Sequence, residues 1–167
     1  MSHTTGTFQA GGGWAEVRAD GQVLRYRRSG SGRSVLLLCV GAACESPWSA
    51  LVAALDADFR VLVPVLPPAA HLVRGLTAFL DGLGTTRVAV VATGDLCGAA
   101  LELALQDPDR VARAVLVPDA PADHAGVDAT LRATAHDLAV PLSVLPRGTP
   151  TDELLVRIGA FLAHSWE

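Results

Sequence analysis

The residues best suited to chemistry lie in one short turn, Gly94–Gly98. Asp95 supplies a carboxylate and Cys97 a thiol where the apolar run 87–94 gives way to a helical pattern. The positive end of a helix dipole favours a carboxylate and raises the thiolate fraction of a cysteine. Asp95 is therefore a candidate for proton transfer and Cys97 for nucleophilic or acid–base work. The alternatives are a charge that stabilises the helix end, for Asp95, and a buried small hydrophobe, for Cys97.

A second pair of candidate groups follows the apolar run 111–117. Asp119 comes two residues after this run, and His124 lies five residues further on. An imidazole titrates near neutral pH, so His124 is the histidine best placed to exchange protons at that edge of a sheet. The alternative for both residues is that they are solvated parts of a loop.

Other chemistries are excluded by what the chain lacks. It has no lysine, so a P-loop and a Schiff-base mechanism are ruled out. Gly94 and Gly98 do not make the G-x-G-x-x-G spacing of a dinucleotide site. The three cysteines, Cys39, Cys44 and Cys97, contain no C-x-x-C pair and are irregularly spaced, which argues against zinc and against a disulfide framework. We expect no metal, no cofactor and a cytoplasmic protein, with Cys39 and Cys44 packed in the interior.

Charge and length narrow the partners. The net charge is −4 and no lysine or arginine cluster indicates nucleic acid or an anionic membrane. Apolar runs such as 61–66 are far shorter than the roughly 18 residues that a membrane span needs. The 167 residues fit one domain, which we place at 14–167 after a disordered lead-in at 1–13. The expected partner is a small molecule.

The elements that would position these residues follow a regular order. Alternation around Asp20-Gly21 predicts an antiparallel hairpin. Five apolar runs then alternate with helical patterns, and strands that are apolar on both faces belong to a parallel sheet covered by helices. The fold class is therefore α/β, a mainly parallel twisted sheet with helices on both faces and an N-terminal antiparallel hairpin. The runs are 34–40, 59–66, 87–94, 111–117 and 139–145, and the helices are expected at 48–55, 71–82, 97–106, 128–137 and after a cap at Thr149.

This order of segments resembles the α/β-hydrolase superfamily. The string GQVLRYRRSGSGRSVLLLCVG is similar to the opening hairpin and first parallel strand of that family. The string RVAVVATGDLCGAALELALQDPDRVARAVLV is similar to its nucleophile strand, the helix behind it and the next strand. The resemblance covers roughly 14–165, and it implies a site at the carboxyl ends of the strands.

The resemblance fails at each position that serine-hydrolase chemistry needs. In the family's G-x-S-x-G elbow the serine is the nucleophile, and that position falls on Gly94. The oxyanion His-Gly falls on Cys39-Val40, and the Gly-His pair that presents the catalytic base falls on Gly148-Thr149, where Thr149 fits a helix cap. The resemblance therefore implies a shortened, capless member without the triad.

Two functions are compatible with these observations. The first is a non-hydrolytic enzyme of biosynthesis, such as a cyclase, isomerase or lyase, that binds a small acyl or polyketide-like metabolite. The second is a catalytically inactive pseudo-hydrolase that serves as a binding or partner protein. Apolar surface left uncovered by the missing parts predicts a homodimer in either case. The site residues are Asp95, Cys97, Asp119 and His124 for catalysis, and Gly94, Cys39 and Val40 for substrate binding.

Overall fold

The structure is a computed structural model, and it describes residues 13–39, 48–66, 69–118, 137–146, 148–164 and 166. Several expectations fall on other parts of the chain. They concern the lead-in before Gly13, residues 128–136 of the helix expected at 128–137, and the residues Val40, Cys44, Asp119 and His124, all of which lie outside the described residues.

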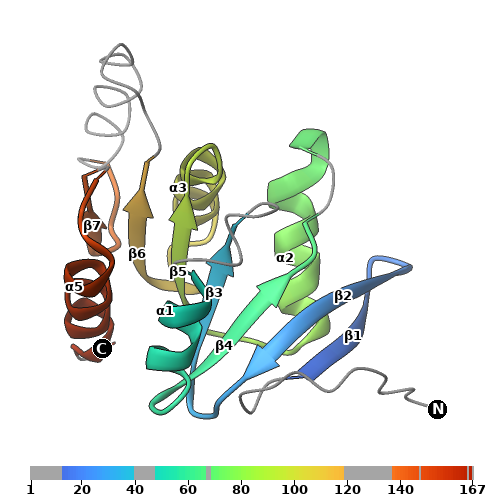
Figure 1. Ribbon diagram of the computed structural model, residues 1–167. Coiled ribbons are helices and arrows are strands. Elements are labelled where there is room, and N and C mark those ends of the chain that lie inside the picture. The colour runs from blue at the N-terminus through green and yellow to red at the C-terminus, as the bar shows by residue number, and fades with distance from the viewer. Residues whose placement is uncertain are drawn as a thin grey trace.

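All described strands belong to one seven-stranded sheet with the order β1-β2-β4-β3-β5-β6-β7 (Figure 1). β2 pairs antiparallel with β1 and with β4, whereas the four remaining pairings are parallel. This arrangement confirms the predicted mainly parallel sheet with an N-terminal antiparallel hairpin. The strands are β1 (Gly13–Ala19), β2 (Gln22–Ser29), β3 (Arg33–Leu38), β4 (Phe59–Pro64), β5 (Val88–Thr93), β6 (Val111–Val117) and β7 (Leu142–Val144).

The hairpin turn is formed by the two residues that predicted it. Ala19 pairs with Gln22, and Asp20 and Gly21 between them have φ of 50° and 76°. Two positive φ angles in a two-residue loop make the turn whose twist matches the strands, and aspartate and glycine tolerate that conformation best.

Helices cover both faces of the sheet, as Figure 1 shows. Because side chains alternate along a strand, each central strand contributes to two cores. In β3, Leu36 and Leu38 belong to one core, and Val35 and Leu37 belong to the other. The first core includes residues of α2 (Leu72–Gly82) and α3 (Leu96–Gln106), and the second includes residues of α1 (Trp48–Leu55) and α5 (Thr151–Ala163). A 3₁₀ turn, η2 (Ala69–His71), precedes α2. Among the described helices, none has the length and apolar character needed to cross a membrane.

The start of α5 differs from the prediction. Pro150 stands at the N-cap, and its carbonyl accepts a 2.8 Å hydrogen bond from the Leu154 amide. Thr149 lies one residue too early to cap the helix, and its Oγ1 donates to the Pro146 carbonyl at 2.6 Å. The prediction that Thr149 caps this helix is therefore wrong, because the extended backbone of Pro150 (ψ 146°) delays the first turn.

Candidate functional site

The turn between β5 and α3 is the centre of the candidate site. Gly94 has a φ of 53°, in the left-handed region that side chains strain and glycine accepts. Its amide donates to the Val117 carbonyl at the end of β6 (3.0 Å), and its carbonyl accepts from the Cys97 amide (3.2 Å). The residue at the predicted nucleophile position thus holds a tight strand-to-helix turn and has no side chain.

Asp95 follows directly and stands at the N-cap of α3. Its side chain makes no capping hydrogen bond to the helix, and the residue is exposed. The sequence placed a carboxylate at the start of this helix, and the structure has it there. The Asp95 carboxylate is therefore accessible to solvent beside Gly94.

Cys97 is buried one turn further into the fold. It is 2% exposed, belongs to the first core, and its Sγ lies 3.6 Å from the Ala92 carbonyl oxygen as a donor. This environment favours the packing interpretation of Cys97 over a nucleophile that meets substrate.

The end of β3 lies beside the turn. Leu38 pairs with Ala92, and the Thr93 hydroxyl donates to the Leu38 carbonyl at 3.4 Å. Cys39, the next residue, is buried at 5% exposure and follows Leu38, whose partner Ala92 comes two residues before Gly94.

Cys39 also corrects a prediction, because it is disulfide-bonded, whereas Cys97 is not in a disulfide. The expectation that irregular spacing argues against a disulfide is wrong for Cys39. Pairing depends on how closely the fold brings two Cα atoms together, which spacing in the sequence does not give.

For the predicted site residue Asp119, the structure gives only the position at which the chain leaves the preceding strand, β6. Thr93 pairs with Val117, so the chain leaves β6 beside the candidate turn. Asp119 comes two residues later in the sequence, but Asp119, His124 and Val40 lie outside the described residues. The strand pairing supports the expectation that the segment after β6 starts near Gly94.

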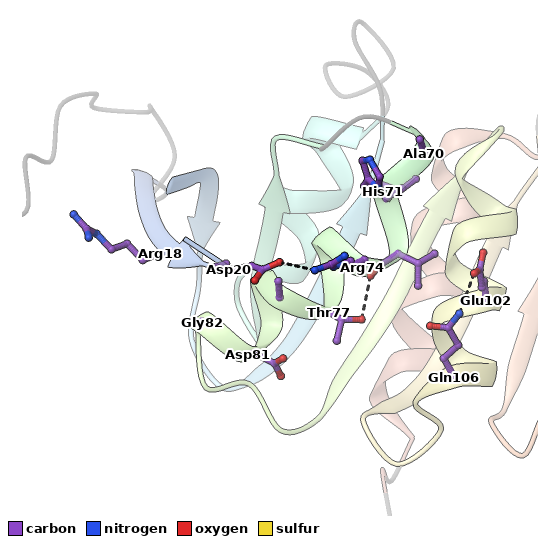
Figure 2. A pocket seen from close by; sticks show the side chains of 14 residues that line it. Arg18, Asp20, Ala70, His71, Arg74, Thr77, Asp81, Gly82, Glu102 and Gln106 are labelled. Atoms are coloured by element: carbon purple, nitrogen blue, oxygen red, sulfur yellow. Dashed lines mark hydrogen bonds and ion pairs between the residues drawn. The ribbon is translucent and has the colours of Figure 1, made fainter. Parts of the chain in front are cut away.

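A groove of about 710 Å³ lies elsewhere, between the hairpin turn, the exposed side of α2 and α3 (Figure 2). Its lining includes none of the predicted site residues. Asp20 and Arg74 form a 3.3 Å ion pair there and both are well exposed, while Arg18 points away from them. The charged side chains that line this groove do not point toward a common centre. In the part of the chain that the structure describes, no three His, Cys, Asp or Glu side chains gather as a metal site.

One feature was missed by the sequence interpretation. The Trp14 ring on β1 has the guanidinium groups of Arg25 and Arg27, both on β2, at 4.8 and 4.9 Å from its centroid. The signal was present, because residues two apart on a strand share a face and Trp14 pairs with Arg27.

Comparisons with known proteins place the fold. No protein-family model and no curated protein matches the sequence. Solved structures do match it, among them a variant of the meta-cleavage product hydrolase from Pseudomonas fluorescens at 24% identity, TM-score 0.55, over 61% of this chain and 43% of that one. An epoxide hydrolase from Vigna radiata matches at 25% identity, TM-score 0.56, over 74% and 46%. A bacterial membrane phospholipase A matches at 17% identity, TM-score 0.57, over 65% and 40%.

The matches span less than half the length of these proteins. At such identities they show architecture and leave activity open. The mainly parallel seven-stranded sheet with its N-terminal antiparallel hairpin is consistent with them. The chain has the α/β-hydrolase fold.

Proposed function

We propose that this protein binds a small acyl or polyketide-like metabolite at the Gly94 turn and transforms it without hydrolysis, as a cyclase, isomerase or lyase. The observation that carries the proposal is the positive φ of Gly94 with an exposed Asp95 beside it. The turn of a nucleophile strand is retained, but a carboxylate is the reactive group that remains next to it.

The absence of hydrolysis follows from two positions. Gly94 has no side chain that could attack a carbonyl. Thr149 stands where the resemblance implies a catalytic base, and its hydroxyl is bonded to the Pro146 carbonyl. Neither residue is able to form or break down an acyl-enzyme.

The proposed chemistry uses groups that belong to the turn. Amide groups at the start of a helix hold an oxyanion, and Asp95 lies at the start of α3. The Asp95 carboxylate takes a proton from the carbon next to a bound carbonyl, and the resulting enolate oxygen is held by amides. Return of that proton to a different carbon completes an isomerisation, with no external reactant.

The alternative is a catalytically inactive pseudo-hydrolase that binds a ligand or partner. The burial of Cys97 supports it, because Asp95 is then the one acid–base side chain that the described residues offer at the turn.

The test uses the N-acetylcysteamine thioester of acetoacetate, a small β-ketoacyl compound. We expect it to shift the amide NMR signals of Gly94, Asp95 and Leu96. In deuterated buffer it should gain deuterium faster at the carbon between its carbonyls when the protein is present. Asp95→Asn should keep binding and lose most of this acceleration, whereas Asp152→Asn, a matched exposed acid in the first turn of α5, should change neither.

Three results would count against the proposal. Release of free thiol that depends on the protein indicates hydrolysis. Unchanged exchange with Asp95→Asn removes the carboxylate from the mechanism. Binding without any accelerated exchange favours the pseudo-hydrolase.

A further inference from the structure

The last strand of the sheet, β7, offers backbone groups for pairing on its outer side. Within the described residues it stands at one end of the sheet and pairs with β6 alone (Figure 1). The Pro141 carbonyl accepts a hydrogen bond from β6 at 3.0 Å, and the Leu145 amide donates one to it at 2.8 Å. Because the backbone polar groups of successive strand residues point to opposite sides, those of Leu142 and Val144 point away from β6.

The two ends of the sheet differ in how they are protected from pairing with another chain. β1, at the other end, carries the exposed charges of Glu16 and Arg18, which oppose such pairing. The run 138–146, which contains β7, has no charged residue. Proline also protects edges, but Pro141 directs its backbone groups to β6 and removes no donor from the outer side. β7 therefore lacks the protection that β1 has.

Charge and symmetry favour a second copy of this chain as the partner of β7. The chain has a net charge of −4, so two copies repel each other over most of their surfaces, but the uncharged run 138–146 contributes no repulsion. Val144, 40% exposed, adds apolar area there. An edge strand is complementary to its own copy when the two run antiparallel. We propose that two copies pair through β7 around a two-fold axis beside Ser143.

The outward groups determine the register of this pairing. Leu142 of one copy exchanges both hydrogen bonds with Val144 of the second copy, and the same exchange recurs across the axis. The two Ser143 residues then face each other as a non-hydrogen-bonded pair, with Cα atoms about 4.5 Å apart. A shift of two residues leaves either Leu142 or Val144 without a partner in β7. Each copy uses the same edge, so the assembly closes at a dimer.

The affinity of this dimer is expected to be modest. β7 has three residues, and a pair of such strands is small beside the roughly 1,200 Å² that a stable interface buries. We therefore expect a dissociation constant in the micromolar range, measured by sedimentation equilibrium.

The register is tested by a cross-link. Ser143→Cys should give a disulfide-linked dimer on mild oxidation, because Cα atoms about 4.5 Å apart are within the range that a disulfide spans. The same change at Ser49, exposed on α1, should give no more dimer than the wild type, whose own cysteines set the background. Non-reducing gels compare the three proteins.

The contribution of the edge is tested by one added charge. Val144→Glu places like charges near the axis in both copies, and it should raise the dissociation constant about tenfold at low salt. The matched control is Val23→Glu, because Val23 on β2 is 53% exposed and lies outside the proposed contact. It should change the constant less than about twofold.

A third variant, Val144→Thr, keeps the charge, the approximate size and the backbone N–H, and it should dimerise like the wild type. Thermal melting checks that each variant is folded. Thioester binding at Gly94 should be unchanged in all of them, so failure here is distinguishable from failure of the proposed function.

Hydrogen exchange tests the proposed bonds directly. The amides of Leu142 and Val144 should become better protected as the protein concentration rises. The Leu145 amide, which is bonded to β6, should be protected at every concentration.

Four outcomes would overturn the inference. A monomer with protected Leu142 and Val144 amides indicates that another part of the same chain covers the edge. A monomer in which both amides exchange freely leaves the edge unpaired. Equal weakening by Val144→Glu and Val23→Glu places the dimer contact elsewhere. Cross-linking of Ser143→Cys no faster than that of Ser49→Cys excludes the register.

Discussion

Replacement of Gly94 is expected to destabilise the protein through the backbone conformation of that residue. A residue with a Cβ pays roughly 1–2 kcal/mol to stay in the left-handed region, where Gly94 lies at φ 53°. Alanine also restricts the unfolded chain, which returns roughly 0.4–1 kcal/mol. The net loss for Gly94→Ala is therefore about 1 kcal/mol, and the melting temperature should fall by about 2–4 °C for a chain of this size.

The matched control is Gly98→Ala, four residues along the chain. Gly98 lies inside α3, is exposed, and a Cβ there would meet nothing within 4 Å. Its replacement should stabilise the protein by about 0.5–1 kcal/mol, since alanine is the better helix former. The same chemical change thus has opposite signs at the two glycines.

A third variant distinguishes conformation from crowding. Asparagine tolerates the left-handed region better than alanine although it is larger. Gly94→Asn should therefore be more stable than Gly94→Ala. Urea unfolding gives all three free energies. If Gly94→Ala is as stable as the wild type, or if Asn is worse than Ala, the turn does not have the geometry described above.

Three further predictions concern the scaffold. Alkylation of the denatured chain should add fewer groups without reductant than the three it adds after reduction, because Cys39 is disulfide-bonded; three groups without reductant would contradict the disulfide. Gly82→Ala should destabilise by about 1–3 kcal/mol despite the gain in helix propensity, because its Cβ would lie 2.6 Å from the Arg18 carbonyl oxygen; calorimetry showing a higher melting temperature would refute this. Arg110→Gln should cost about 1 kcal/mol at low salt and less near 1 M salt, because its guanidinium pairs with two carboxylates at 2.7 and 3.2 Å; a loss independent of salt would point to another cause.

Local patterns predicted the elements well. The helix expected at 48–55 is found at Trp48–Leu55, and the apolar run 111–117 is the strand Val111–Val117. The strand is apolar on both faces and the helix has apolar residues at helical spacing, so the sequence pattern alone distinguishes strand from helix here. The last strand, Leu142–Val144, is shorter than its apolar run 139–145, although Pro141 and Leu145 beside it also hydrogen-bond to β6.

Only those parts of the candidate site that follow from the order of strand, turn and helix along the chain could be predicted from the sequence. Gly94 and Asp95 follow an apolar strand and precede a helix, and this order places them at a strand end. The disulfide of Cys39 and the stack on Trp14 depend on pairings across the fold, which no local pattern contains. The homodimer remains a prediction, with β7 as one edge of the sheet.

The position of β2 has a consequence for trimming the chain. The hairpin is joined to the rest of the sheet through β4, where Arg28 pairs with Leu62 and Ser29 with Val61. A chain shortened to begin at β3 would turn β4 from an interior strand into a bare edge rich in aliphatic residues. Edges of that kind recruit other strands and seed aggregation, whereas β1 ends the sheet with Glu16 and Arg18. The hairpin therefore protects the edge of β4 from pairing with other chains. Expression of shortened chains should yield inclusion bodies unless β1 and β2 are kept.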